Sequence, residues 1–160
     1  MGSGKSTIGL SLAKALNYSF IDLDILIQKE EKKSIETIFT NNGEAHFRKL
    51  ESKYLRSLSN KSNTVIALGG GTPCHNDNMK WINAHGLSIY LNVSEDTLFH
   101  RLKNVKNERP LLKGFDDKRL KKYITLKIAE RLPYYSQAKF TVNGNDNCLD
   151  AIKDIINQNN

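Results

Sequence analysis

Hydrophobic residues along this chain switch repeatedly between the spacing of helices and the spacing of strands. In KSTIGLSLAKAL (5–16) they recur every three to four residues, which predicts an amphipathic helix. The next segment, YSFIDLD (18–24), is predicted to be a short strand that ends in acidic residues. Two helical stretches follow, and the second, over residues 43–58, carries one apolar face: Phe47, Leu50, Tyr54, Leu55 and Leu58.

The second half of the chain continues this alternation. In NTVIALGGG (63–71) the unbroken apolar run VIAL predicts a buried strand, and the glycines end it. Further strands are predicted at LSIYLNV (87–93) and AKFTV (138–142). A helix is predicted after Ser94, which is placed as an N-cap, and another from about residue 116. A closing helix is predicted from one apolar face: Leu149, Ile152, Ile155 and Ile156.

The order of these elements predicts the fold class. Strands that alternate with helices favour an α/β fold in three layers, with a mostly parallel sheet covered by helices on both faces. A chain of 160 residues can bury the core of one domain, so residues 1–160 are predicted to form a single domain. Only NVKNERPLLKGF (104–115) fits neither period; composition favours a plain loop, and a mobile lid is the alternative.

Composition and charge narrow the class of protein. The longest apolar runs are too short to span a bilayer and no basic-then-apolar leader is present, which predicts a cytoplasmic protein without a membrane partner. Cys74 and Cys148 lie far apart, as is typical of ordinary thiols in a reducing compartment. The formal charge of +7 favours anionic partners. In KRLKKYITLK (118–127), however, basic and apolar residues interleave as in an amphipathic helix, so we predict no nucleic-acid binding.

The start of the chain carries the strongest chemical signal. MGSGKST (1–7) contains the end of the phosphate-loop pattern G-x-x-x-x-G-K-[ST], directly before an amphipathic helix. Gly2 and Gly4 let the backbone curl around phosphates, and the helix N-terminus adds partial positive charge. Lys5 is predicted to bridge the β- and γ-phosphates of a nucleotide, and the hydroxyl of Ser6 is predicted to bind Mg²⁺.

Two acidic residues and three glycines follow predicted strands. Asp22 and Asp24 are two residues apart at the end of a predicted strand, which would place their side chains on the same face. Such a pair suits a site for Mg²⁺ and a hydroxyl-bearing substrate, although acids in this position also cap helices. Gly69, Gly70 and Gly71 leave bare backbone at a strand's carboxyl end, where a tight turn needs fewer glycines, and this favours close approach of a ligand.

Four arginines are candidates for contacts with anions, yet each also has an ordinary surface interpretation. Arg48 follows Glu44 by four residues and precedes Glu51 by three, as on a helix face with surface ion pairs. Arg101 lies on the helix before the irregular segment, and Arg109 lies within that segment. Arg131 lies in ERLPYY (130–135), where a proline should bend or end a helix.

Six motifs occur in an order and approximate spacing that resemble the shikimate kinase family: MGSGKST, DLD, SIETIF…GEAHFRKLE, LGGGT, RPLL and ERLPYY. The resemblance extends from residue 1 to about residue 143. It implies a P-loop, nucleoside-monophosphate-kinase-like fold with a five-stranded parallel sheet. It also implies transfer of the γ-phosphate of ATP, with Mg²⁺, to the 3-hydroxyl of shikimate, on the route to aromatic amino acids. We expect the protein to be a monomer.

The resemblance assigns the nucleotide and the metal to residues at the start of the chain. The residues that would hold ATP are Gly2, Ser3, Gly4, Lys5, Ser6 and Thr7. Ser6 and Asp22 would hold Mg²⁺, the latter through water. Arg109, on a lid at about 104–115, would close over the phosphates and act in catalysis together with Lys5. Arg101 would lie against adenine.

The acceptor side is assigned in the same way. Asp24 would receive shikimate hydroxyls and orient the attacking one or accept its proton. Arg48 and Arg131 would grip the shikimate carboxylate, because a guanidinium offers a forked, permanent positive charge. Gly69, Gly70 and Gly71 would offer their backbone to the substrate.

The sequence departs from the family at its start. The family has a strand and the first loop glycine before the residues that correspond to MGSGKS, and that strand is the central one of the sheet. Without it, neighbouring strands would keep unpaired backbone groups, at roughly 1–3 kcal/mol for each that is buried, beside an apolar slot. We therefore expect the natural protein to begin about ten residues earlier, the length of a strand and its turn. We expect poor folding and little kinase activity from a chain that begins at Met1.

Three other functions are compatible with the phosphate loop. A kinase for another small hydroxylated metabolite, such as gluconate, would lack the full set of Asp24, Arg48, the three glycines and Arg131. A nucleotide kinase is disfavoured because no set of side chains for a base is evident. A catalytically silent nucleotide-binding or partner-binding domain would bind ATP without shikimate-dependent release of ADP.

Overall fold

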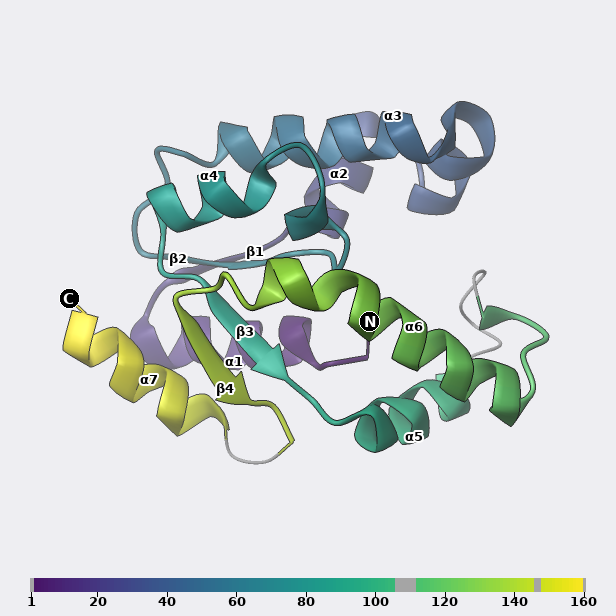
Figure 1. Ribbon diagram of the computed structural model, residues 1–160. Coiled ribbons are helices and arrows are strands. Elements are labelled where there is room, and N and C mark those ends of the chain that lie inside the picture. The colour runs from purple at the N-terminus through teal and green to yellow at the C-terminus, as the bar shows by residue number, and fades with distance from the viewer. Residues whose placement is uncertain (1, 106–111, 146–147, 160) are drawn as a thin grey trace.

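Helices and strands alternate along the computed structural model, which describes residues 2–105, 112–145 and 148–159 (Figure 1). The elements are, in order, α1 (Lys5–Leu16), β1 (Ser19–Asp22), α2 (Leu23–Glu31), α3 (Ile35–Ser57), β2 (Thr64–Ala67), the 3-10 helix η1 (Thr72–Cys74), α4 (Asn78–His85), β3 (Ile89–Asn92), α5 (Glu95–Val105), α6 (Asp117–Tyr135), β4 (Phe140–Asn143) and α7 (Cys148–Asn159). The predicted alternation is confirmed, whereas α4 and η1 were not predicted from the hydrophobic spacing.

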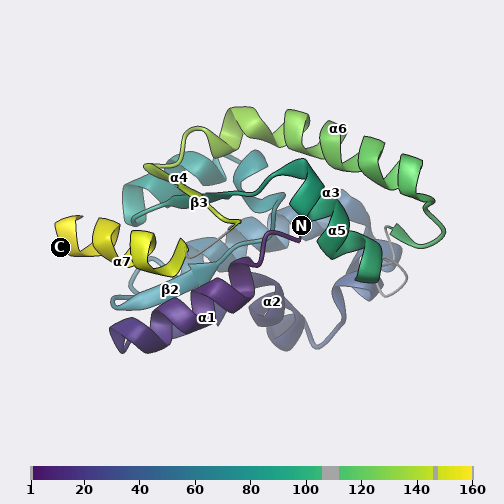
Figure 2. The ribbon, with the colours of Figure 1, turned by 90° about the horizontal axis from the view of Figure 1, so that it is seen from below.

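The strands are parallel, and helices cover both of their faces. β1 pairs with β2 from Ser19↔Thr64 to Asp22↔Ala67, and β3 pairs with β4 in the same direction. Because successive strand residues point to opposite faces, Val65 packs with α1 and α7 while Ile66 packs with α2 and α3. Figure 2, seen from the side of α1 and α7, has α3 behind the strands. The α/β class in three layers with parallel strands is confirmed.

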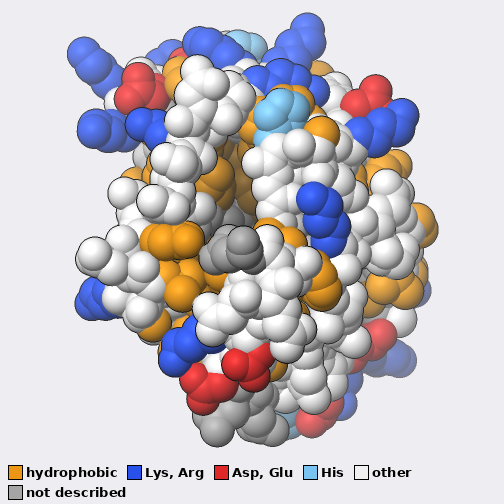
Figure 3. All heavy atoms as spheres, turned by 90° about the vertical axis from the view of Figure 1, so that its left-hand side faces the viewer, with side chains coloured by type: hydrophobic (Ala, Val, Ile, Leu, Met, Phe, Trp, Pro, Cys, Tyr) orange, Lys and Arg blue, Asp and Glu red, His pale blue; other side chains and the backbone are white. Residues whose placement is uncertain are grey.

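β2 and β3 are not paired with each other. Within the described ranges each has a strand partner on one edge only, so two sheets of two strands take the place of one continuous sheet. A cavity of about 920 Å³ is lined by apolar residues of both inner strands and of the helices around them: Leu12, Val65, Ile66, Met79, Ile82, Ile89, Leu91, Ile152 and Ile156. Figure 3 shows this hollow from the side on which the strands begin, with hydrophobic side chains inside it. The structure thus contains the apolar slot expected from the resemblance.

Polar side chains mark the starts of several helices. Ser94 Oγ accepts a hydrogen bond from the backbone N–H of Thr97 at 3.2 Å, which confirms the predicted N-cap of α5. Asp116 caps α6 in the same way through the N–H of Arg119, at 2.7 Å. Pro133 lies inside α6, which continues to Tyr135. The helix therefore continues for two residues past the proline and ends within its last turn.

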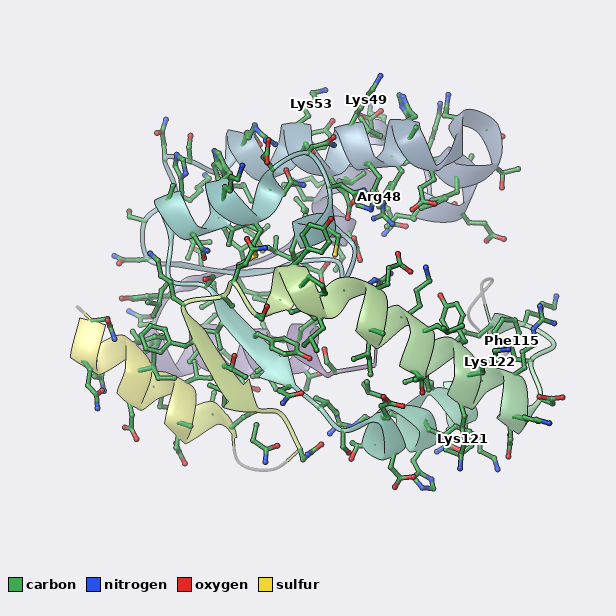
Figure 4. All side chains as sticks on the ribbon, in the orientation of Figure 1. Arg48, Lys49, Lys53, Phe115, Lys121 and Lys122 are labelled. Carbon is green, nitrogen blue, oxygen red and sulfur yellow. The ribbon has the colours of Figure 1, made fainter. Side chains whose placement is uncertain are left out.

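The basic helix α6 is amphipathic, as predicted. Leu120 and Ile124 are buried against α5, whereas Lys121 and Lys122 are exposed (Figure 4). No helix in the described part of the chain is long and apolar enough to cross a membrane. Of the irregular segment 104–115, residues 106–111 lie outside the described residues, and Arg109 is among them.

Candidate functional site

The phosphate loop has the backbone geometry that its glycines predict. Gly2 and Gly4 have φ of 76° and 86°, a region that is open to glycine and strained for other residues. α1 begins at Lys5, so the amides of its first turn have no partner within the helix and are free to bind an anion. Ser3 lies between the two glycines, and Thr7 lies in the first turn of α1.

Arg101 reaches this loop from α5. Its Nη1 lies 3.2 Å from the carbonyl oxygen of Ser3 and 3.4 Å from that of Gly2, and donates to both. The side chain therefore ties α5 to the backbone that curls around the phosphates. Contact of Arg101 with adenine stays a prediction.

Ser6 and Asp22 are in direct contact. Ser6 Oγ donates a hydrogen bond to Asp22 Oδ2 at 2.6 Å. Asp22 Oδ1 accepts from the backbone N–H groups of Asp24 and Ile25 at 3.0 and 3.4 Å, so Asp22 ends β1 and is the N-cap of α2. The predicted strand to residue 24 is wrong, because this carboxylate starts a helix at Leu23. Asp22 and Asp24 converge through a strand-to-helix turn and not through strand alternation.

The Ser6–Asp22 pair fits a magnesium ion whose remaining ligands are phosphate oxygens and water. A hydroxyl and a carboxylate oxygen are ligands that Mg²⁺ prefers. The described residues contain no group of three or more His, Cys, Asp and Glu side chains able to hold a metal. Mg²⁺ commonly takes only one or two protein ligands and completes its shell with phosphate oxygens and water.

Asp24 lies where the phosphate loop meets the glycine turn. Burial raises the pKa of Asp24 above its ordinary value; the charge of Lys5 opposes this, and the charges of Asp22 and Glu51 add to it. A Cβ added to Gly69 would lie 3.1 Å from Asp24 Oδ1. A carboxylate with a raised pKa, next to a lysine and to bare backbone, is suited to accept a proton from a bound hydroxyl.

Arg48 is half-buried and joins an exposed acid to a buried one. Its Nη1 donates to Glu51 Oε2 at 2.7 Å, and the exposed fractions of the two side chains are 15% and 1%. Glu51 Oε1 in turn accepts from Thr72 Oγ1 at 2.5 Å. Burial lowers the pKa of Arg48, but hydrogen bonds and charge from Glu51 and Glu44 outweigh burial and raise it. The predicted ion pairs with Glu44 and Glu51 are therefore present, but only the pair with Glu44 is at the surface.

Side chains from two helices hold the glycine turn. A Cβ added to Gly71 would lie 2.5 Å from Arg48 Nη1 and 2.8 Å from its Cζ, so only glycine leaves room for the guanidinium. On the other side, the hydroxyl of Tyr135 in α6 donates to the carbonyl oxygen of Gly70 at 2.6 Å. Tyr135 lies one helical turn after Arg131. The turn is thus tied to α3 and to α6 at once.

The residues predicted to bind the two substrates lie around one part of the structure. Lys5, Asp24, the three glycines and Arg131 line the same cavity of about 920 Å³ that lies between β2 and β3, and Arg48 lies against Gly71. Burial raises the pKa of the Cys74 thiol, and the charges of Arg131 and Arg48 both oppose this, so both guanidinium groups act on this residue of η1. Arg109 lies outside the described residues.

Sequence reasoning assigned no role to Thr72 and Tyr135, and it named Glu51 only as a surface partner of Arg48, without its burial. Glu51 had a detectable signal, because it lies among the apolar positions Leu50 and Leu55 of a helix that must bury that face. An acid at such a position needs a buried partner. Thr72 and Tyr135 lie in the motifs LGGGT and ERLPYY, but neither periodicity nor spacing shows that the glycine turn contacts α6.

Comparisons with known proteins agree with this geometry. The family model for shikimate kinase matches residues 1–158. The shikimate kinase of Bacteroides thetaiotaomicron is 42% identical over 146 residues, which cover 91% of this chain and 83% of the relative. That of Flavobacterium johnsoniae is 40% identical over 159 residues, which cover 98% and 92%.

Solved structures extend this likeness to the fold. The crystal structure of the Bacteroides thetaiotaomicron enzyme superposes with a TM-score of 0.93 at 38% identity, covering 98% of this chain and 94% of that one. Shikimate kinase from Acinetobacter baumannii, solved in complex with shikimate, gives a TM-score of 0.85 at 29% identity, with coverage of 99% and 87%.

Proposed function

Since the chain belongs to the shikimate kinase family, we propose that it transfers the γ-phosphate of ATP to the 3-hydroxyl of shikimate, giving shikimate 3-phosphate and ADP. The observation that carries this proposal is the convergence of Asp24, Arg48 and Arg131 around a bare glycine turn, beside Lys5. A site that phosphorylates a hydroxyl acid of shikimate's size needs a proton acceptor at the hydroxyl end and cations at the carboxylate end. This site offers both. ATP with Mg²⁺ is the cofactor pair of the family.

On the nucleotide side, this chain would act through charge and through backbone donors. The first amides of α1 and the ammonium group of Lys5 bind phosphate oxygens, and Ser6 and Asp22 would hold Mg²⁺. Bound Mg²⁺ neutralises charge that develops on the phosphates during transfer. Arg101, fixed on the loop carbonyls, keeps α5 against the nucleotide site.

On the acceptor side, the chain would orient the attacking hydroxyl. Arg48 and Arg131 bind the carboxylate, so the ring cannot rotate away from Asp24. Asp24 then accepts the hydroxyl proton, since its carboxylate is more basic than an ordinary one. Arg109 of the lid segment is proposed to complete the positive charge around the transferred group.

The assay that tests this proposal measures ADP release from ATP and Mg²⁺ with shikimate, gluconate or AMP added in turn. Only shikimate should stimulate release, and Asp24→Asn should abolish the stimulation, which excludes a contaminating kinase. Equal stimulation by gluconate would contradict the substrate assignment. ATP binding without stimulation by any acceptor would favour a catalytically silent domain.

We further propose that the chain acts as a single-domain monomer in the cytoplasm, without a nucleic-acid or membrane partner. The absence of a nucleic-acid partner is supported by α6, in which exposed basic residues alternate with buried Leu120 and Ile124 as on an ordinary amphipathic helix. Light scattering of the purified chain at several concentrations should give the mass of one copy, and cell fractionation should recover the protein in the cytosol. A mass of two copies at every concentration would overturn the proposal of a monomer.

A further inference from the structure

Arg48 already has a carboxylate on its outer edge. Nε and Nη2 of Arg48 donate to the same oxygen of Glu44, Oε1, at 3.1 and 2.7 Å. Nη1 donates to Glu51 on the inner side. The Nε–Nη2 edge is one that a carboxylate ligand binds with two parallel hydrogen bonds. Glu44 therefore holds donors of the group that is proposed to bind the acceptor's carboxylate.

The two acidic partners of Arg48 differ in their exposure to solvent. The Glu51 side chain is 1% exposed and the Glu44 side chain is 61% exposed. Glu51 neutralises a buried charge and accepts a second hydrogen bond from Thr72, so its removal would leave Arg48 unpaired in the interior. Glu44 forms an exposed pair four residues away on the helix, which is weak and open to exchange with water.

Glu44 also lies where it can turn away from Arg48. The preceding Gly43 has φ 78° and ψ 171°, so the helix changes direction there and Glu44 begins its second part. The charge of Lys127, which is on α6, also acts on the Glu44 carboxylate. After release from Arg48, the Glu44 carboxylate would still be stabilised by nearby positive charge. Arg48 itself points inward from α3, whereas Lys49 and Lys53 point away (Figure 4).

We propose that Glu44 competes with the acceptor's carboxylate for Arg48, and that binding of the acceptor displaces Glu44 from the guanidinium. This proposal rests on the proposed function, because it takes a carboxylate-bearing acceptor as the ligand of Arg48. Glu44 thereby sets the affinity for the acid: it shields Arg48 while the site is open and lowers the net attraction for any anion. Glu51 stays in place and keeps the guanidinium oriented.

The decisive variant is Glu44→Gln, which keeps the shape of the side chain and removes its charge. We expect the KM for shikimate to fall about two- to fivefold, the range for loss of one exposed ion pair, with kcat and the KM for ATP unchanged. The dissociation constant of shikimate, measured by calorimetry without ATP, should fall by the same factor. Binding of the carboxamide of shikimate, which is uncharged at this end, should not tighten.

Asp150→Asn is the matched control. Asp150 is also exposed, at 75%, and pairs with a neighbouring cation, Lys153, at 2.9 Å on α7, away from the residues of the site. If the control lowers the KM for shikimate as much as Glu44→Gln does, the effect comes from the overall charge of the protein and not from competition for Arg48, and the proposal is wrong. A higher KM in Glu44→Gln would make Glu44 a positioning residue for Arg48, and an unchanged KM would also overturn the proposal. If the parent chain neither binds nor phosphorylates shikimate, the proposed function fails, and this inference fails with it.

Discussion

The Ser6 hydroxyl donates a hydrogen bond of 2.6 Å to Asp22 Oδ2, and this contact joins the phosphate loop to the end of β1. The other oxygen of Asp22 caps α2 and so fixes the turn that brings Asp24 beside Gly69. One carboxylate therefore connects the proposed metal site with the proposed acceptor site.

Asp22→Asn should separate the charge of this residue from its capping role. Asparagine caps helices as well as aspartate does, so the thermal midpoint should change little. Loss of the negative charge should weaken Mg²⁺ binding about 10- to 100-fold, seen as a higher Mg²⁺ requirement in the ADP-release assay. An unchanged Mg²⁺ dependence would remove Asp22 from the metal site.

The activity should depend on pH through Asp24. Burial holds the pKa of Asp24 above 3.8, and the ionised form is the one that accepts a proton. kcat/KM for shikimate should therefore decline as the pH falls through this raised pKa, at a higher pH than for an ordinary aspartate. Asp24→Asn should lower kcat about 10²- to 10⁴-fold, the usual contribution of a general base. A residual activity near that of the parent would exclude this role.

Asp24→Asn should also stabilise the fold. The folded-state pKa is raised, so the folded protein binds this proton more tightly than the unfolded chain does. The contribution of Asp24 to stability is thus fully present below 3.8 and is lost as the pH rises through the folded pKa. At neutral pH the ionised group is unfavourable, and a neutral isostere should raise the thermal midpoint, as measured by calorimetry. A lower midpoint at pH 7 would contradict this sign.

Gly71→Ala should disrupt the binding of the acceptor. The added methyl group would lie 2.5 to 2.8 Å from the guanidinium of Arg48, which must move. A displacement of about 1 Å costs on the order of 10²-fold in kcat/KM, and most of this should appear in the KM for shikimate. Gly86→Ala is the control: its nearest neighbour would be the carbonyl of Ile82 at 3.9 Å, and kinetics should not change.

Tyr135→Phe should loosen the glycine turn. The substitution keeps the ring, which packs 4.9 Å from that of Tyr90, and removes the hydroxyl that donates to the carbonyl of Gly70 and interacts with Arg131. Loss of one such bond should raise the KM for shikimate about fivefold and leave the KM for ATP unchanged. The exposed neighbour Tyr134, changed to Phe, should behave like the parent. A drop in stability with unchanged KM would reduce Tyr135 to a packing role.

The cavity between β2 and β3 should accept a strand. Both inner strands have one unpaired edge in the part of the chain that the structure describes, and helices cover both faces of the slot. A segment of about five Val and Ile residues, joined ahead of Met1, should pair with both edges and raise the thermal midpoint by several degrees. A Gly/Ser segment of equal length should leave it unchanged. Equal midpoints for the two would show that the slot does not take a strand.

Periodicity alone predicted most of the elements, because a residue's place in a helix or strand depends on its near neighbours. The N-cap at Ser94, the amphipathic α6 and the parallel α/β class all followed from local spacing. The helix start after Asp22 did not, because one capping carboxylate outweighed an apparently strand-like run. α4 was missed because it has only eight residues, Asn78–His85, which are too few for a helical period to stand out.

The sequence by itself determined the chemical types at the site: a lysine before a hydroxyl, two acids, three glycines and arginines in a recognisable order. It did so because motif spacing is a property of the chain. Only the tertiary structure decided that Arg48 is held by buried Glu51 and faces exposed Glu44, and that Tyr135 secures the glycine turn. Burial and contact between residues 65 positions apart arise from packing, and no local pattern encodes them.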